Sequence, residues 1–495
     1  MPRLSNTKLN AITLYANFIV LALVGLVANP LLVRFIGSQQ FGIWRSCLRI
    51  LDLTSVADGR ATQALKWILA HRALQDDTEA KQREVGAAIA IWMIWLPFLL
   101  TGVAIAIFAL PHLIKDVPPQ LYGTARMAAG LLAMNVVLTA LLGIPDSVLA
   151  GTNQGFRSYV VTTTFLVLSN AAMVLAGAAG MGIVGLGAAT LGGSLLTGIV
   201  ALAVARRYVS WWGVRRPSRA DVKRVFGFSN WTMVWSLVQM FMLSSEVLLI
   251  GYLVGPDAVT RYTFTSYVTQ FAISICLMTG SAVTPRLGAM VGAGQQAEAA
   301  QLYAATRQAL LAIASVAAAG LILCNAAFVS VWAGSRFFLG PETNIAMVLV
   351  MVQLALVRFD AQIQDVGLKI AGKVITGSVA AALSVGLAAL FYLLTHAIAA
   401  IFIGLVVGRL PLNVLFPRQV RQLIPEARVD LRGMAGMLAI VAASYALSRW
   451  WQPAGWGGLL LSAVAALALS VTVSLLVILS PQTRAQVLAM ARRRI

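Results

Sequence analysis

The chain has 495 residues, of which 59% are hydrophobic and only 11% are charged, and its mean hydropathy is +0.84. This composition excludes a soluble multidomain enzyme and is typical of a polytopic membrane protein. Lysine and arginine number 37 against 17 acidic residues, which gives a formal net charge of +20. The distribution of that charge decides whether it indicates nucleic acid or a membrane surface.

Apolar windows of about 20 residues predict an all-α polytopic membrane protein with about 14 transmembrane helices. The first run is too long and too polar at its flanks for a cleaved signal peptide, so we expect a retained helix. The predicted spans are 11–33, 43–71, 85–110, 121–150, 157–179, 183–205, 225–254, 260–290, 303–323, 343–368, 374–395, 397–416, 433–452 and 456–479.

A basic loop separates six of these spans from the other eight. The segments that we predict are an N-terminal six-helix bundle (1–205), a basic cytoplasmic linker (206–224), a C-terminal six-helix bundle (225–417), two additional helices (433–480) and a basic cytoplasmic tail (481–495). Six spans per half keep the halves in one orientation and favour a central cavity between two bundles. The seventh and eighth spans also resemble the first and second, since Phe35–Trp44 aligns with Leu253–Tyr262. A chance likeness between glycine-containing turns is the alternative.

Basic residues collect in alternate loops, as expected when the N- and C-termini are cytoplasmic. The strongest cluster comprises Arg206, Arg207, Arg215, Arg216, Arg219, Lys223 and Arg224. Topology and contact with anionic lipid headgroups explain this cluster better than a nucleic-acid site does. We therefore expect membrane lipids as partners and no nucleic acid.

The second span carries a charged stripe. On one helix, six polar side chains share roughly one third of the circumference: Arg45, Arg49, Asp52, Arg60, Gln63 and Lys66. A charge near the bilayer centre costs roughly 2.5 to 3.5 kcal/mol on insertion scales, so the stripe is expected to face a water-filled cavity or another helix.

Four cations against one carboxylate in this stripe indicate an anionic ligand. The planar guanidinium fork suits phosphate, and a pyrophosphate can engage two forks. We predict that Arg49 and Arg60 bind a pyrophosphate, that Asp52 orients Arg49, and that Arg45, Gln63 and Lys66 contribute to substrate binding. The alternative is that Arg49 and Asp52 form an internal ion pair that only fixes helix packing.

A second polar face lies on the tenth span, where Arg358, Gln362, Asp365 and Lys369 recur at helical spacing while Asp360 points elsewhere. Arg358 is a further substrate-binding candidate, and Asp365 is a candidate for coupling or for an ion pair with Arg358. Glu246, alone in the apolar seventh span, is either a coupling group or a packing carboxylate.

Signatures of catalysis are missing from the sequence. Gly367 to Lys373 reads G-x-x-x-x-G-K, but Val374 follows where a P-loop requires Ser or Thr. The acidic pair Asp76-Asp77 has no further carboxylate array typical of a metal site. We therefore predict no catalytic residue, no metal and no cofactor.

Two motifs carry a family resemblance. Residues 34–44 read R-F-I-G-S-Q-Q-F-G-I-W, followed by L-D-L at 51–53 and D-G at 58–59, and residues 246–256 read E-V-L-L-I-G-Y-L-V-G-P. With the six-plus-six-plus-two layout, these resemble the polysaccharide and lipid-linked oligosaccharide flippases of the multidrug/oligosaccharidyl-lipid/polysaccharide (MOP) exporter superfamily. Aspartate is commoner in those proteins at the position of Glu246.

The resemblance implies a flippase that moves undecaprenyl-pyrophosphate-linked oligosaccharide, an O-antigen, exopolysaccharide or capsule repeat unit, across the bacterial cytoplasmic membrane. It further implies alternating access driven by an ion gradient or by the membrane potential, with polysaccharide polymerase or export machinery as partners. In some relatives the last two helices form a groove for the lipid tail.

Other classes of protein predict other features. A drug/cation antiporter of the same superfamily should have a net acidic cavity, and it usually has 12 spans. A membrane-embedded glycan polymerase should have a large external loop. A lipid scaffold should tolerate loss of the central charges.

Overall fold

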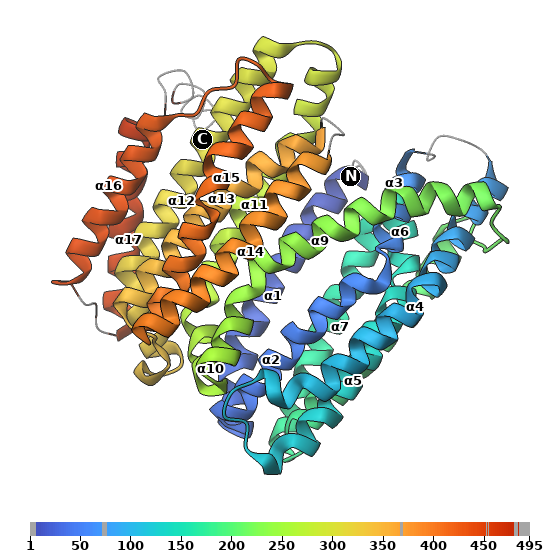
Figure 1. The fold of residues 1–495 in the computed structure, drawn as a ribbon, viewed down its shortest axis with the longest axis horizontal. Helices are drawn as coiled ribbons and strands as arrows, with labels where there is room; N and C mark the ends of the chain where they lie inside the picture. Colours follow the sequence, from blue (N-terminus) through green and yellow to red (C-terminus); the bar gives the residue numbers. More distant parts are fainter. Residues whose placement is uncertain are drawn as a thin grey trace, which may run out of the picture. The chain divides into compact units, whose positions relative to one another are not determined.

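The computed structural model describes residues 6–71, 77–366, 370–451, 453, 455–479 and 484, which form helices and no β-strand (Figure 1). Thirteen helical segments in this described part are long and apolar enough to cross a membrane. They correspond to all the predicted spans except 43–71. The chain is thus an all-α, multi-pass membrane protein.

Two compact units make up the chain, an N-terminal unit (Met1–Thr260) and a C-terminal unit (Arg261–Ile495). The helices up to the boundary are α1 (Asn6–Ile36), α2 (Ser38–Thr54), η1 (Ser55–Asp58), α3 (Ala61–His71), α4 (Thr78–Leu113), η2 (Pro119–Leu121), α5 (Tyr122–Leu142), α6 (Ile144–Gly151), α7 (Gly155–Ala178), α8 (Gly182–Tyr208) and α9 (Arg219–Leu253). Helix α10 (Pro256–Thr265) crosses the boundary between the units.

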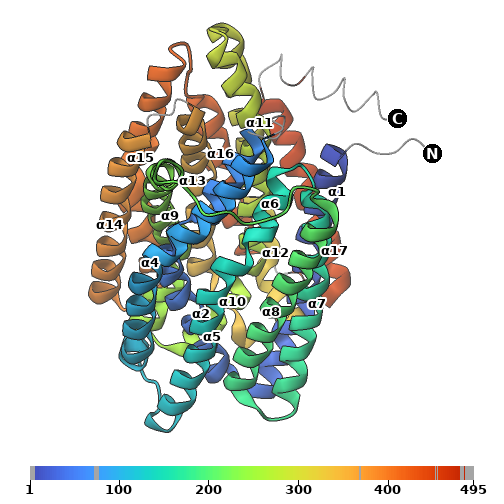
Figure 2. The ribbon, with the colours of Figure 1, turned by 90° about the vertical axis from the view of Figure 1, so that its right-hand side faces the viewer.

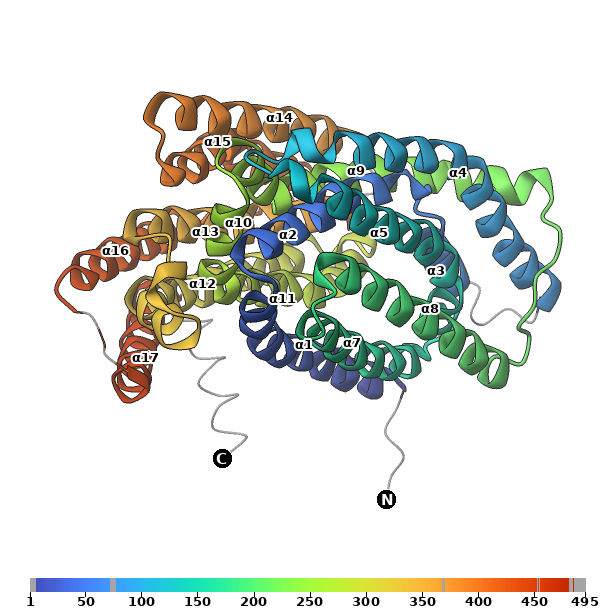
Figure 3. The same cartoon turned by 90° about the horizontal axis from the view of Figure 1, so that it is seen from below.

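The C-terminal unit continues with α11 (Tyr267–Gly292), α12 (Gln296–Trp332), η3 (Ser335–Phe337), α13 (Pro341–Val366), α14 (Ile370–Thr395), α15 (Ile398–Leu423), α16 (Leu431–Ser448), α17 (Gly455–Val473) and the π-helical turn η4 (Ser474–Ile478). Helices α14 and α15 run side by side (Figure 3). The terminal pair, α16 and α17, packs on α12 (Figure 1). The predicted basic tail from residue 485 onward lies outside the described residues.

Helix α9 packs on α2, α3 and α4 and therefore belongs to the N-terminal unit. The sequence places the same helix at the start of the second bundle, at residue 225. Packing contacts divide the chain after Thr260, whereas the sequence repeat divides it before residue 225. The bounds of the two six-helix bundles therefore stay predictions.

The connections of the N-terminal unit gather at two ends. At one end, Asn10 donates to Asn153 at 2.8 Å, Gln154 donates to the Tyr208 carbonyl, and Arg224 pairs with Glu84 at 2.6 Å. At the other end, the Lys115 amide donates to the Gly251 carbonyl. Loops that the sequence assigns to one side of the membrane thus lie at one end of this unit. We call the first end, which holds the arginine cluster, the basic end.

The two aligned turns share a backbone feature. Gly37 has a φ of 81° and Gly255 a φ of 129°, values that favour glycine. The turns also touch, because the Thr260 hydroxyl donates to the Ser38 carbonyl at 2.6 Å and a Cβ on Gly42 would lie 1.9 Å from the Pro256 carbonyl oxygen. Both turns lead into a helix that soon ends, at Thr54 in the first case and at Thr265 in the second.

Candidate functional site

The predicted second span is broken in the middle. Helix α2 ends at Thr54, and the turn η1 is followed by Gly59 with φ 73° and Arg60 with φ 46° before α3 begins at Ala61. The Asp58 carboxylate accepts a hydrogen bond from the Arg60 amide at 2.8 Å, which closes the turn. The prediction of one continuous helix over 43–71 is therefore wrong, and with it the single stripe.

Packing fixes the two parts of the broken span. The apolar face of α3, formed by Ala61, Ala64, Leu65 and Leu69, joins a core with side chains of α4, α6, α8 and α9. A Cβ on Gly59 would lie 2.3 Å from the Trp95 ring, so that only glycine fits there. The polar face of α3 consequently points away from this core.

The break adds a feature that a continuous helix lacks, a helix N-terminus at depth in the membrane. The first amides of a helix have no intrahelical acceptor and carry partial positive charge. Arg60 immediately precedes the first residue of α3. Half-helix ends of this kind bind anionic groups in membrane transporters.

Two ion pairs flank the break. Arg49 contacts Asp52 at 3.3 Å, and the two side chains are 40% and 44% exposed. Arg60 contacts Asp58 at 4.0 Å, with 19% and 14% exposed. Arg60 also acts electrostatically on Asp52. The half-exposed Arg49 and Asp52 favour an aqueous surrounding, since lipid would not solvate their charges. This segment, residues 49–60, is the charged break.

The other predicted binding residues have different surroundings. Arg45 donates to Asn29 of α1 at 2.9 Å and lies over the Phe41 ring, so it links α1 and α2. Gln63 and Lys66 are exposed on the polar face of α3. Lys66 interacts electrostatically with Asp146 of α6.

The sequence argument from excess positive charge needs correction. It set Arg45, Arg49, Arg60 and Lys66 against Asp52 alone. The structure adds Asp58 beside Arg60 and Asp146 near Lys66, so that three carboxylates accompany the four cations. The Asp-Gly turn signal at 58–59 was available in the sequence. The reasons to expect an anion are now the half-exposed Arg49, the partly exposed Arg60 and the helix N-terminus.

In the C-terminal unit, Asp365 forms an ion pair with Lys373 of α14, a partner that helical spacing on α13 could not predict. Arg358 is buried on α13 and close enough to Asp365 for electrostatic attraction. Lys369, predicted on the same face, lies outside the described residues. The binding role of Arg358 stays a prediction.

The sequence analysis missed a buried charge cluster in the C-terminal unit. Arg307 of α12 donates to both oxygens of Asp360 at 2.6 and 2.5 Å, and the Tyr303 hydroxyl donates to Asp360 at 2.7 Å. Both charged side chains are 2% exposed. Asp360 points away from Asp365, as predicted, and its partner is 53 residues away in the sequence.

Glu246 is buried on α9, at 4% exposure. Its predicted part in coupling stays a prediction, like that of Asp365. Within the described residues, no group of three or more His, Cys, Asp or Glu side chains could hold a metal ion.

A network of charges holds the basic end together. Arg215 pairs with Glu79 at 2.7 Å, and Arg83 and Arg224 both contact Asp221, which forms a capping box with Ser218 at the start of α9. Burial opposes ionisation of Asp221, but the Ser218 hydrogen bonds and the Arg224 and Arg83 guanidiniums outweigh it and lower the pKa of this carboxyl.

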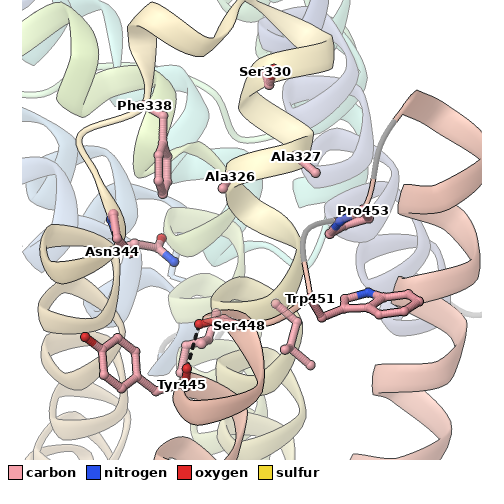
Figure 4. Close-up of a pocket in the computed structure, with 12 residues that line it drawn as sticks. Ala326, Ala327, Ser330, Phe338, Asn344, Tyr445, Ser448, Trp451 and Pro453 are labelled. Atoms are coloured by element: carbon pink, nitrogen blue, oxygen red, sulfur yellow. Dashed lines mark hydrogen bonds between the residues drawn. The ribbon is translucent and has the colours of Figure 1, made fainter.

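A cavity of about 380 Å³ lies between α12, the start of α13 and the end of α16 (Figure 4). Phe338, Tyr445 and Trp451 line it together with Asn344 and Ser448. The Trp451 indole donates to Ser462 of α17, so this cavity belongs to the seam between the terminal helix pair and the rest of the unit. Among the described residues, none of the side chains that line it is charged.

Comparisons with known proteins agree with this architecture. A family model described as "Polysaccharide biosynthesis protein" matches residues 9–291. The chain is similar to the lipid II flippase MurJ in an inward closed conformation, with a TM-score of 0.72 and 11% identity over 94% of this chain and 98% of that chain. No curated protein sequence matches.

Multidrug transporters are similar as well. An inward-facing MATE family transporter of the MOP superfamily has a TM-score of 0.56 and 16% identity, covering 83% of this chain and 94% of that chain. The Vibrio cholerae MATE transporter VcmN has a TM-score of 0.58 and 14% identity over 86% and 98%. At these identities the structures establish the fold alone.

Proposed function

Because the chain belongs to the polysaccharide biosynthesis protein family and has the MOP-superfamily fold, we propose that it translocates a polyprenyl-pyrophosphate-linked oligosaccharide across the bacterial cytoplasmic membrane. The structures that it resembles are flippases and transporters rather than enzymes. The cargo that we propose is an undecaprenyl-pyrophosphate-linked repeat unit of O-antigen, exopolysaccharide or capsule.

The charged break carries this proposal. Arg49 and Arg60 present guanidiniums that are partly open to water, and the α3 N-terminus begins directly after Arg60. Two guanidiniums and a helix N-terminus suit the two phosphoryl groups of a pyrophosphate. The paired Asp52 and Asp58 would orient the guanidiniums while the site is empty.

We further propose alternating access around a central cavity, with the basic end of the N-terminal unit and both chain termini cytoplasmic. The arginine cluster supports this orientation through the positive-inside tendency. Glu246 or Asp365 would couple an ion gradient or the membrane potential to transport. Polysaccharide polymerase or export machinery would receive the product.

The test is translocation of a labelled polyprenyl-pyrophosphate oligosaccharide in proteoliposomes. We expect Arg60→Gln to reduce the rate by about 10- to 100-fold, the equivalent of one lost charge-assisted hydrogen bond. Arg449→Gln, which removes an exposed ion pair with Glu342 in the C-terminal unit, is the matched control and should retain the wild-type rate. Equal rates in both variants would contradict the assigned site.

A cationic dye serves as the competing cargo in the same vesicles. Dye export without movement of the sugar lipid would overturn the proposal in favour of a drug/cation antiporter. Movement of neither cargo by the wild type would also overturn it.

A further inference from the structure

A groove of about 530 Å³ with both polar and apolar side chains in its lining lies inside the N-terminal unit, between α5, α6, α7 and α8. Helices α7 and α8, which run side by side (Figure 2), carry most of its lining. Seven serine or threonine hydroxyls, the Asn170 amide and the Asp146 carboxylate face it, together with Leu142, Phe165 and Leu166. By contrast, Leu168 and Leu175 on α7 are exposed outside this groove, as expected for lipid-facing residues.

Hydrogen bonds within the helices use the donors of several of these groups. The hydroxyls of Thr139, Thr190 and Thr197 donate to backbone carbonyls four residues earlier, at 2.7 to 2.9 Å. Asn170 donates its amide to the Leu166 carbonyl at 2.8 Å. What these groups retain toward the groove is mainly acceptor lone pairs. This part of the groove therefore suits a ligand that can donate hydrogen bonds.

The groove adjoins the charged break. Asp146, at the groove, interacts electrostatically with Lys66, and Lys66 follows Arg60 by six residues, about 9 Å along a helix. A group held at the groove is thus within reach of an anion held at Arg60.

From this arrangement we infer that the groove binds the sugar portion of the cargo while the charged break holds its pyrophosphate. This inference rests on the proposed function and deepens it. Sugar hydroxyls both donate and accept, so they can donate to the lone pairs of Thr139, Thr190 and Thr197 and accept from other hydroxyls of the groove. The apolar Leu142, Phe165 and Leu166 match the C–H faces of a sugar ring. A lipid acyl chain offers no polar atom to the Asp146 carboxylate or to the Thr162 and Ser194 hydroxyls.

The experiment uses the full chain in lipid nanodiscs and two probes. One probe is polyprenyl pyrophosphate without sugar, and the other is the same lipid carrying the oligosaccharide of the producing cell, purified from its lipid extract. Wild-type protein should bind the glycosylated lipid about tenfold more tightly. Ser194→Trp fills the groove at a residue without a hydrogen bond in the described part of the chain. It should abolish this preference without changing affinity for the sugar-free lipid.

Leu196→Trp, at a 52% exposed position on the same helix, is the matched control and should behave as wild type. If Ser194→Trp fails to fold, Thr162→Val removes one groove hydroxyl at nearly constant volume and should weaken binding of the glycosylated lipid alone by about 2- to 10-fold.

The binding experiment has two outcomes that would contradict the inference. Equal affinity of the wild type for both lipids, or an undiminished preference in the groove variants, would overturn the sugar groove and leave the pyrophosphate site standing. Binding of neither lipid by the wild type would overturn the proposed function itself.

Discussion

Two arginine–aspartate pairs, one in each unit, have the same chemistry and opposite surroundings. Arg307 and Asp360 are each 2% exposed, and the Tyr303 hydroxyl hydrogen-bonds to both of them. Arg49 and Asp52 are 40% and 44% exposed, next to a broken helix. The first pair is enclosed by its neighbours and has no room for a ligand. The second pair keeps its outer faces open, so exposure rather than residue type separates the pair that we assign to packing from the pair that we propose for binding.

The sharpest test of this difference is Arg307→Met. It leaves the Asp360 carboxylate buried without its cation, and we expect the free energy of unfolding to fall by about 3–5 kcal/mol. Thermal unfolding of the purified protein in detergent measures the loss. Arg449→Met, at an exposed ion pair in the same unit, should cost no more than about 1 kcal/mol. Equal losses of unfolding free energy in the two variants would show that the Arg307–Asp360 pair is not a buried ion pair.

The backbone break itself is tested by Gly59→Ala. Its φ of 73° strains any other residue by about 1–2 kcal/mol, and the new Cβ would meet the Trp95 ring at 2.3 Å. We expect the melting temperature to fall and transport to fall with it. Gly192→Ala on α8 meets no atom within 4 Å and should be neutral or slightly stabilising. A tolerated Gly59→Ala would argue against the break.

A smaller effect on stability is expected from Arg49→Gln. An exposed pair contributes about 0–1 kcal/mol, so the melting temperature should scarcely change. Translocation should nevertheless decrease, which separates a binding role from a packing role. A large loss of stability with unchanged transport per folded molecule would reverse the assignment of the two pairs.

The smallest effect on stability is expected at Asp221, which lies with its arginine partners at the basic end rather than within a membrane span. Its pKa is lowered in the folded protein, so its ionised form stabilises the fold above about pH 4, and this contribution is lost as pH falls further. We expect wild type to be more stable than Asp221→Asn at pH 7 and the difference to shrink toward pH 3. Melting temperatures of both proteins across this range measure it, and a constant difference would contradict the lowered pKa.

Hydropathy alone predicted the membrane-spanning helices well, because each needs only length and apolar composition. It failed at residues 43–71, where apolar residues continue through a turn that Asp58 and Gly59 impose. Helical periodicity that is continued across this turn assigns residues of α2 and α3 to one helix face, although they belong to two separate helices.

Helical periodicity also could not predict ion pairs between residues on different helices. Lys373 lies on α14, whereas Asp365 lies on α13, and Arg307 meets Asp360 across 53 residues. The groove hydroxyls went unnoticed because serine and threonine are common in apolar helices and bond to their own backbone. Only the packing of α7 and α8 reveals that they gather.

The broken span also has a consequence for synthesis of the protein. Helices α2 and α3 have 17 and 11 residues, about 26 Å and about 17 Å, and each is shorter than the roughly 30 Å hydrocarbon core. Neither is a strong stop-transfer signal, since both also carry charges that the translocon disfavours. Residues 38–71 therefore depend on α1 and α4, which flank them and pack on them, to remain in the bilayer.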